Sequence, residues 1–364
     1  MKPFLTIEEN DEIALPKKYH EINNICAVIY DQLTEIYSDP IYKELQETTV
    51  DLDENSNFIE QLNTGEINGL DWLKKNKLNP ELEIMLSKNI ILAVCSDFIN
   101  FIFESLYNAK RGKLTVAYAL LRKPLTDELL IFEQLLSDRT DFINRFFYQG
   151  NPQDYDPSNR DLDKSKIIEK AISKLRLQLF PSAEFIYDLR YNKECEYGIN
   201  GISNHALHIV TKDRNYKTSN RNLNFVFSQK DDFEKYFAHY YNLVPYLLVY
   251  SVSIVDEIVF SILKDEDSQN LRIIKEFKRF IGLILLTEKT SVTTENSNEK
   301  LFKEFEKALA FTCPKCNKEN AIERADCILF FSTEVFLCAS CFENLLSTKE
   351  AFKILENALH GVKK

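Results

Sequence analysis

The sequence predicts a mainly α protein: a multi-helix, bundle-like domain followed by a small zinc ribbon made of a β-hairpin and a helix. Apolar residues recur at helical spacing along most of the 364-residue chain, which has only eight glycines. Hydrophobic residues make up 45% of it, enough for a substantial core. Two Cys-x-x-Cys pairs occur near the C-terminus. We predict a helical domain over 1–290, a linker with a connecting helix over 291–310, and the ribbon with its terminal helix over 311–364.

Helical spacing is clear in residues 21–37, where Ile22, Ile25, Ile29 and Leu33 lie on one stripe. Further helices are predicted at 82–107, 112–136, 164–180 and 270–286. The second of these contains Pro124, which removes one intrahelical hydrogen bond and crowds Leu120. We therefore expect either a kinked helix or two helices there.

The longest uncharged run spans residues 240–255 and is followed by Asp256 and Glu257. It is shorter than the ~20 residues that a membrane-spanning helix needs, so we interpret it as a buried core helix. The N-terminus has no apolar segment typical of a signal peptide. Scattered thiols such as Cys26, Cys95 and Cys195 suit a reducing compartment. We expect a cytoplasmic protein without a membrane partner.

Polar, turn-rich segments separate the predicted helices. One of them leads into residues 222–228, whose sequence NLNFVFS is the best strand candidate before residue 300 and is expected to form either a short edge strand or an extended arm. Residues 287–300 have the composition of a linker, and we place the domain boundary there.

The four cysteines Cys313, Cys316, Cys338 and Cys341 are predicted to bind Zn²⁺, with an iron–sulfur cluster as the alternative. Two residues between thiolates allow one tight turn to present both sulfurs to one ion, and two such turns complete a tetrahedral site. The 21 residues between the pairs fit a β-hairpin with strands over 321–331 and 334–338. An amphipathic helix over 342–360 is expected to close the ribbon. Cys327 is predicted to be a packed thiol in the first strand.

The predicted zinc site is structural rather than catalytic. Four cysteines close the coordination shell, whereas a catalytic zinc keeps one position open for water. Residues 313–341 carry three basic and four acidic side chains, and the whole chain has a formal net charge of -11. Nucleic acid is therefore not a favoured partner, and we expect the ribbon to complete the fold or to dock a protein.

Residues 197–211 carry the strongest alternative site, with two of the five histidines. On a helix, His205 lies at the border of the apolar face and His208 about 60° further round. With Arg190 close in sequence, these three residues are the catalytic candidates. The competing interpretation is a histidine bonded to a backbone carbonyl plus a surface histidine.

Two further polar features have structural and functional interpretations. Arg122 and Glu133 would share a face if one helix ran unbroken, which predicts either an ion pair at a helix seam or a buried polar site. The basic stretches 108–113 and 214–222 are either solvated loops or, if they meet, a phosphate-binding patch. The P-loop, dinucleotide-binding and serine-hydrolase motifs are absent from the sequence.

Residues 109–138, AKRGKLTVAYALLRKPLTDELLIFEQLLSD, preceded by a long apolar helix, resemble the central helix pair of HEPN-like helical domains. The resemblance covers residues 80–260 and implies a helical scaffold and a bacterial defence context, such as abortive infection. Members of that family with nuclease activity carry an Arg followed four to six residues later by His. None of the five histidines here has that spacing, so the resemblance implies a binding or dimerisation module rather than an RNase.

We therefore expect a cytosolic bacterial interaction or regulatory protein of a phage-defence system, with a structural zinc ribbon and a protein partner or homodimer. One alternative is a nuclease or nucleotide-processing enzyme that uses Arg190, His205 and His208. Another is a structural subunit of a larger complex.

Overall fold

A computed structural model describes residues 4–48, 60–61, 64–65, 68–75, 79–180, 182–290, 302–303 and 305–361. Helices dominate these residues, and their one sheet pairs two short antiparallel strands, β1 (Ala310–Thr312) and β2 (Glu319–Ala321). The predicted mainly α class is therefore confirmed. Most of the linker predicted at 287–300, from residue 291 onward, lies outside the described residues.

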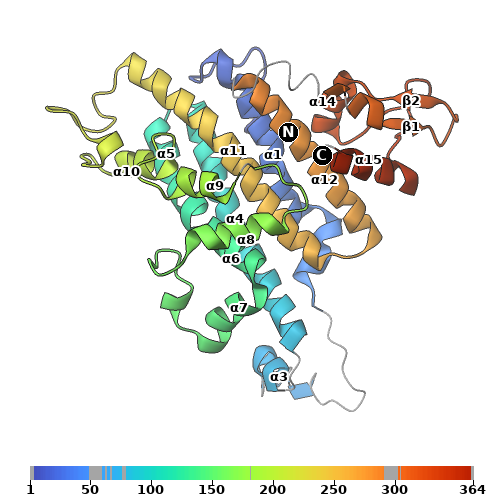
Figure 1. Ribbon diagram of the computed structural model, residues 1–364, viewed down its shortest axis with the longest axis horizontal. Helices are drawn as coiled ribbons and strands as arrows, with labels where there is room; N and C mark the ends of the chain where they lie inside the picture. The colour runs from blue at the N-terminus through green and yellow to red at the C-terminus, as the bar shows by residue number, and fades with distance from the viewer. Residues whose placement is uncertain are drawn as a thin grey trace.

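Four helices form the centre of the molecule: α1 (His20–Ser38), α4 (Asn79–Lys110), α11 (Lys230–Ile262) and α12 (Glu266–Lys289) (Figure 1). Polar side chains join α11 to its neighbours inside the apolar core. Tyr241 donates a hydrogen bond to Asn23 of α1 (3.0 Å), and the hydroxyls of Tyr240 and Ser105 of α4 lie 2.7 Å apart. The elements at both ends of the molecule are attached to these central helices.

Two of these helices, α4 and α11, are long and apolar enough to cross a membrane by length and composition. The most apolar 18-residue window of α11 is 89% buried inside the fold, and that of α4 is 39% buried. The burial of α11 agrees with the core helix predicted for residues 240–255.

The segment around Pro124 is a helix interrupted by a wider turn. Helix α5 (Leu114–Arg122) continues into a π-helical segment, η3 (Lys123–Glu128), and then into α6 (Leu129–Ser137). Proline has no N–H to donate and its ring displaces the preceding turn, so the backbone bulges rather than breaks. This agrees with the prediction of a kinked helix, and the bulge changes which side chains face outward after residue 122.

The helical body contains further, mostly short helical elements. They are η1 (Lys17–Tyr19), η2 (Pro40–Gln46), α3 (Gly69–Lys75), α7 (Arg139–Ile143), the π-helical η4 (Asn144–Gln149), η5 (Pro152–Asp154), α8 (Lys164–Lys174), α9 (Ala183–Arg190), α10 (Ile199–Leu207) and η6 (Arg214–Tyr216).

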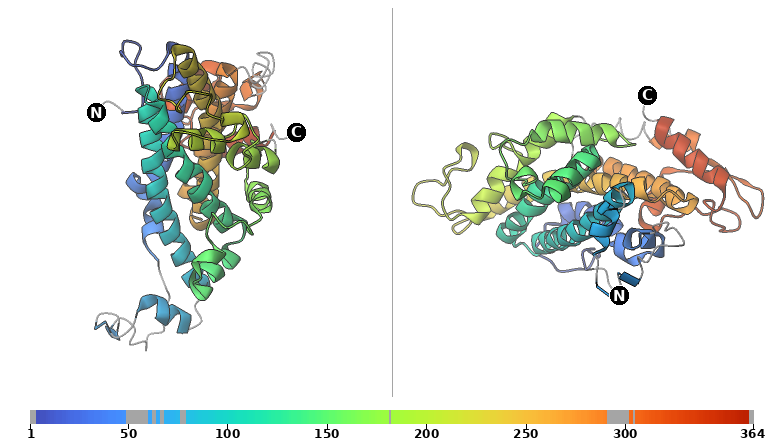
Figure 2. Two further views of the ribbon diagram at one scale, coloured as in Figure 1. Left: turned by 90° about the vertical axis from the view of Figure 1, so that its left-hand side faces the viewer. Right: turned by 90° about the horizontal axis from the view of Figure 1, so that it is seen from below.

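The edge strand predicted as one alternative for 222–228 is wrong, because residues 224–227 form a turn with irregular backbone on both sides. Asn224 explains the difference: its N–H donates to the carbonyl of Ile209 and its side-chain amide to that of His208. The side-chain amide of Asn224 thus bonds to the backbone, where a strand would need hydrogen bonds to the backbone of a neighbouring strand. Figure 2 shows this loop projecting from the end of the molecule opposite to the C-terminal module, which comprises residues 310–361.

The C-terminal module differs from the predicted hairpin. The strands predicted over 321–331 and 334–338 are wrong, since most of the first is helix α14 (Arg324–Thr333) and the second is irregular apart from one bridge at Leu337. A capping box between Glu323 and Asp326 starts the helix, and this local signal prevails over the apolar run after it. The closing helix is present as α15 (Lys349–Gly361), starting later than predicted.

The module packs on α12 (Figure 1) through aromatic, apolar and ionic contacts. The ring of Phe277 on α12 meets Phe330 of α14 edge to face, with centroids 5.2 Å apart. Gly282 leaves room for Phe331, whose ring a Cβ at that position would approach to 2.8 Å. Arg324 donates two hydrogen bonds to Glu288, of 3.0 and 2.8 Å. The module and the helical body therefore share one hydrophobic core.

Candidate metal centre

Each cysteine pair lies in a tight turn that joins two short antiparallel segments of backbone. In the first turn, the N–H of Cys313 donates to the carbonyl of Lys318 (2.8 Å), and β1 and β2 continue the pairing. In the second, the N–H of Cys338 donates to the carbonyl of Glu343 (2.9 Å), next to the bridge between Leu337 and Asn344. The hairpin predicted between the pairs is thus replaced by one small hairpin at each pair.

The two turns share an unusual backbone position directly after the second cysteine. Asn317 follows Cys316 with φ of 57°, and Phe342 follows Cys341 with φ of 58°. Left-handed backbone reverses the chain sharply enough to bring both sulfurs of a pair to the same side. Asparagine tolerates this conformation, whereas a bulky side chain such as phenylalanine is strained in it.

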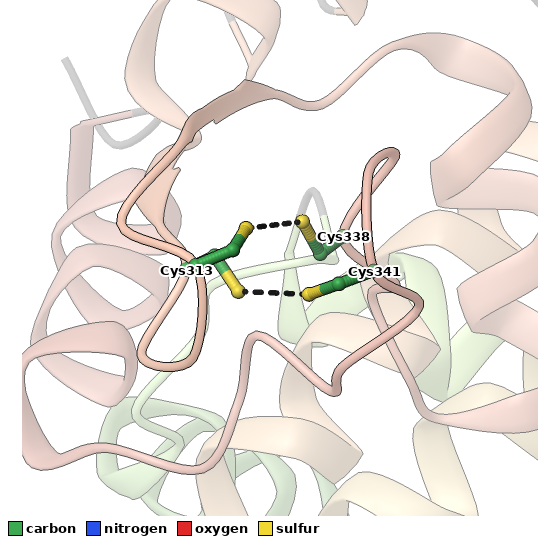
Figure 3. Close-up of side chains that lie close together, drawn as sticks. Cys313, Cys338 and Cys341 are labelled. Atoms are coloured by element: carbon green, nitrogen blue, oxygen red, sulfur yellow. Dashed lines mark hydrogen bonds between the residues drawn. The ribbon is translucent and has the colours of Figure 1, made fainter.

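The four sulfurs gather between the turns, as Figure 3 shows for the labelled residues Cys313, Cys338 and Cys341. All four lie within 4.8 Å of one another. The sulfurs of Cys313 and Cys341 are 3.5 Å apart, and those of Cys316 and Cys338 are 3.6 Å apart. These distances exceed the roughly 2.05 Å of a disulfide. They are close to the ~3.8 Å that tetrahedral coordination with Zn–S distances of about 2.3 Å requires. The predicted ligand set therefore fits a metal ion.

The protein environment favours the thiolate form at Cys338. The backbone N–H of Ser340 donates to its sulfur at 3.4 Å, and this hydrogen bond, together with that from the N–H of Cys341 and the contacts of the neighbouring cysteine sulfurs, lowers the pKa of Cys338 to about 6. The thiolate is the form that binds metal, so at neutral pH this ligand is ready to coordinate.

Asn320 connects the two turns independently of any metal. Its side-chain amide donates to the carbonyl of Lys318 (2.9 Å) in the first hairpin, and its oxygen accepts from the N–H of Ala339 (3.0 Å) in the second. The side chain is buried. One asparagine thus holds the two halves of the site in register. Cys327 is also buried, as predicted for a packed thiol, although it lies in α14 rather than in a strand.

Arg190, one of the catalytic candidates, is 0% exposed and ends α9. Its guanidinium donates to the carbonyl of Leu125 (2.6 Å), to the carboxylate of Glu133 (2.5 Å) and to the hydroxyl of Tyr191 (2.9 Å). Glu133 also accepts from Tyr250 (2.6 Å). Burial raises the pKa of Glu133, and Arg190 and Tyr250 oppose that shift. Glu133 is thus paired with Arg190 rather than with Arg122, which is exposed.

The two candidate histidines have different surroundings. His205 is half-buried, with Nδ1 lying 3.1 Å from the Thr211 hydroxyl and 3.0 Å from the carbonyl of Tyr216. Burial lowers the pKa of His205, so its ring is neutral at physiological pH. His208 is exposed just after α10 ends. The partners of Arg190 and His205 do not overlap among the described residues, so these two candidates are not joined through a common neighbour.

Sequence reasoning did not single out His239, which lies in α11. The Tyr118 hydroxyl is 3.0 Å from one ring nitrogen of His239, and the Tyr216 hydroxyl is 3.4 Å from the other. Burial lowers its pKa to about 4. His239 is therefore a partly buried histidine that is neutral at physiological pH, and its place in the sequence gave no signal of these contacts, which come from Tyr118 and Tyr216 on other elements.

Comparisons of the chain with protein-family models, with curated proteins and with solved structures gave no match. The resemblance to HEPN-like domains thus stays a prediction.

Proposed function

We propose that this protein is a cytosolic bacterial interaction or regulatory protein of a phage-defence system, and that a structural Zn²⁺ bound by Cys313, Cys316, Cys338 and Cys341 holds its C-terminal module together. The observation that carries the metal part of the proposal is the closed set of four sulfurs, all within 4.8 Å of one another, while the defence and interaction role rests on the resemblance of residues 109–138 to HEPN-like domains. Four thiolates occupy every position of a tetrahedral ion, so no site for water or substrate is left.

The connection of the module to the helical body supports an organising role for the metal. Glu334, which ends α14, accepts hydrogen bonds from Lys275 (2.8 Å) and Lys278 (2.5 Å) on α12. It lies four residues before Cys338, so the second cysteine turn and the attachment to α12 are parts of one short segment. Zinc at the cysteines would fix this segment and with it the surface that the module presents.

The surroundings of Arg190 disfavour the enzymatic alternative. A guanidinium without exposed surface whose three nitrogens are all hydrogen-bonded inside the protein is not available to a substrate. A structural role for Arg190 follows, and His205 and His208 remain the groups of that hypothesis with some access to solvent.

Metal analysis tests the zinc proposal. We expect about one zinc ion per chain, and its loss with a lower melting temperature in the Cys338→Ser, Cys341→Ser variant. Cys195→Ser is the matched control, because Cys195 is a half-buried thiol outside the cluster. Unchanged metal content in the double variant would contradict the proposal.

Light scattering tests the interaction role. The chain is co-expressed with the products of neighbouring genes, and we expect a complex or a homodimer of defined mass. A chain that stays monomeric with all of them contradicts the interaction role. If it also acts on a nucleotide or nucleic acid, and His205→Ala with His208→Ala abolishes this without lowering the melting temperature, the enzymatic alternative is favoured.

A further inference from the structure

A cleft of about 560 Å³ lies between three parts of the helical body. Ala93, Val94 and Asp97 of α4 form one wall, and Asp127, Glu128 and Ile131 form the second, where η3 passes into α6. The third wall is the segment from Pro152 to Pro157, including Tyr155 and Asp156. This volume is typical of pockets for small molecules. The cleft shares no residue with the cysteine cluster, so ligand binding in the cleft would not depend on the metal.

Hydrogen bonds to backbone carbonyls of η3 hold this wall of the cleft in place. A π-helical turn leaves carbonyls outside the regular hydrogen-bond pattern, and such turns are frequent at functional sites. Here the carbonyl of Leu125 accepts from Arg190 (2.6 Å) and that of Thr126 from the Tyr191 hydroxyl (2.6 Å). The buried Arg190 thus fixes the bulge that brings Asp127 and Glu128 to the cleft.

The lining carries four carboxylates, those of Asp97, Asp127, Glu128 and Asp156, and no lysine or arginine. Lys123 contacts two of these carboxylates from outside the lining, at Asp97 and at Glu128. The positive charge of Lys164 interacts electrostatically with the other two carboxylates, those of Asp127 and Asp156. With Glu128 ionised, four carboxylates face two ammonium groups, and with Glu128 neutral, three do, so negative charge is in excess around the cleft in both states.

Glu128 is the group that points to a ligand. Its side chain is more than nine-tenths buried, and within the part of the chain that the structure describes the Lys123 ammonium, 3.1 Å from one carboxylate oxygen, is its one cationic contact. Lys123 also donates to Asp97, so Glu128 shares this ammonium. A buried carboxylate with a single shared partner is costly, and a cation that brings further N–H groups would relieve that cost.

We propose that this cleft binds a small organic cation: an amine or guanidinium carried on an apolar group. The carboxylates supply the charge partner, and Ala93, Val94, Ile131 and Tyr155 supply apolar contact for the rest of the ligand. A bare divalent metal ion is a poorer fit. Among the described residues, the cysteines are the one group of three or more potential ligands whose donor atoms converge.

Calorimetric titration of the full-length protein with benzamidine tests the proposal, with benzyl alcohol as the neutral probe. We expect saturable binding of benzamidine and none of benzyl alcohol. At about pH 9, where most of Glu128 is ionised, Glu128→Gln and Asp127→Asn should each weaken binding by about tenfold or more. Glu104→Gln is the matched control, because Glu104 is an exposed acid of α4 outside the cleft lining, and it leaves binding unchanged.

The pH dependence gives a second measurement on the same protein. The charged groups facing Glu128 are Asp97 from α4 and Lys123 from η3, and burial raises the pKa of Glu128 to about 8. Benzamidine stays cationic well above that pH, so its affinity should rise by roughly tenfold or more between about pH 6 and pH 8 as Glu128 ionises. In the Glu128→Gln variant, the affinity for benzamidine should no longer rise with pH, whereas binding that does not depend on Glu128 should remain.

Competition between benzamidine and a short lysine-rich peptide distinguishes a free small-molecule ligand from a basic side chain of a partner protein. Displacement of benzamidine by the peptide assigns the site to a basic side chain. Absence of saturable benzamidine binding by the folded wild-type chain, or binding that Glu128→Gln and Asp127→Asn leave unchanged, would overturn the proposal.

Discussion

In the helical body, four long helices bury most of their apolar side chains against one another, and polar groups such as Arg190 and Glu133 are buried only as hydrogen-bonded sets. In the C-terminal module, the two strands have three residues each and the helix between the cysteine turns has ten. The body thus contains enough apolar surface to determine its own fold, whereas the module depends on contacts at a few positions.

The difference shows where each region tolerates unfavourable local structure. The body accepts a π-helical turn at Pro124 because Arg190 and Tyr191 satisfy the carbonyls that it frees. The module accepts left-handed backbone at Phe342 and Glu334, neither of which is a glycine. Such strain persists only where neighbouring contacts, here the cysteine cluster and α12, determine the conformation.

Breaking the buried ion pair of the body should have the largest effect. Arg190→Met leaves the buried carboxylate of Glu133 without its cationic partner, with only the Tyr250 hydroxyl still donating to it, and removes the Arg190 donor from the carbonyl of Leu125. We expect a loss of about 3–5 kcal/mol in the free energy of unfolding, measured by urea denaturation. The double variant Arg190→Met, Glu133→Leu should recover much of it, because no buried charge is then unpaired.

An exposed pair provides the control for this prediction. Lys18 and Glu234 are 2.9 Å apart and both are well exposed, so Lys18→Met should change the stability little. A double variant at Arg190 and Glu133 that is no more stable than Arg190→Met alone would show that packing, rather than charge, dominates there.

The attachment of the module should be sensitive to Gly282 on α12. A methyl group at this position would lie 2.8 Å from the Phe331 ring and 3.1 Å from Ile29. Gly282→Ala is therefore expected to lower the stability by about 1–3 kcal/mol, although alanine is the better helix former. Thermal unfolding and proteolysis of the module measure the effect. Gly361→Ala, where nothing lies within 4 Å, is the matched control, and an equal response of both variants would contradict the predicted clash.

The sequence predicted the features that depend on local pattern: the helical class, the cysteine cluster and the irregularity at Pro124. It could not predict the partner of Glu133, because Arg190 is 57 residues away and Arg122 offered a plausible partner in the same predicted helix. The fold, not the spacing, decides between them.

The errors in the module have a related origin. Residues 321–331 contain the β-branched and aromatic side chains typical of a strand, yet Phe330 and Phe331 pack on α12 from a helix. Residues 222–228 were predicted as a strand for the same reason. In both places, a short polar signal, the Glu323–Asp326 capping box or Asn224, decided the local structure.

The ionic contact between module and body should give a smaller, pH-dependent effect. Burial of Glu334 favours its neutral form, but Lys275 and Lys278 outweigh this and lower the pKa of its carboxyl below the ordinary value. A lowered pKa contributes stability above the ordinary pKa of a glutamate, and this contribution is lost as the pH falls through the folded-state pKa. Glu334→Gln should therefore cost about 1 kcal/mol at neutral pH and progressively less in acid.

Urea denaturation of both chains between about pH 7 and pH 3 measures this difference, since protonation of the cysteines affects both chains alike. A difference that stays constant over the whole range would show that the charge of Glu334 contributes nothing to attachment.

The smallest change in stability is expected at Phe342, and whether this change is a gain or a loss tests the argument. Its side chain is 75% exposed and its φ is 58°, so it gains little from burial and lies in a conformation that favours glycine. Phe342→Gly relieves left-handed backbone that costs about 1–2 kcal/mol, and the extra freedom of glycine in the unfolded chain takes back roughly 0.5–1 kcal/mol, so a small net rise in melting temperature is expected, whereas Phe342→Ala keeps the strain and should give none. A gain from both variants would contradict a backbone origin. If only glycine stabilises the module, the phenylalanine costs stability in the isolated chain, which is expected for an exposed aromatic side chain that contacts a partner.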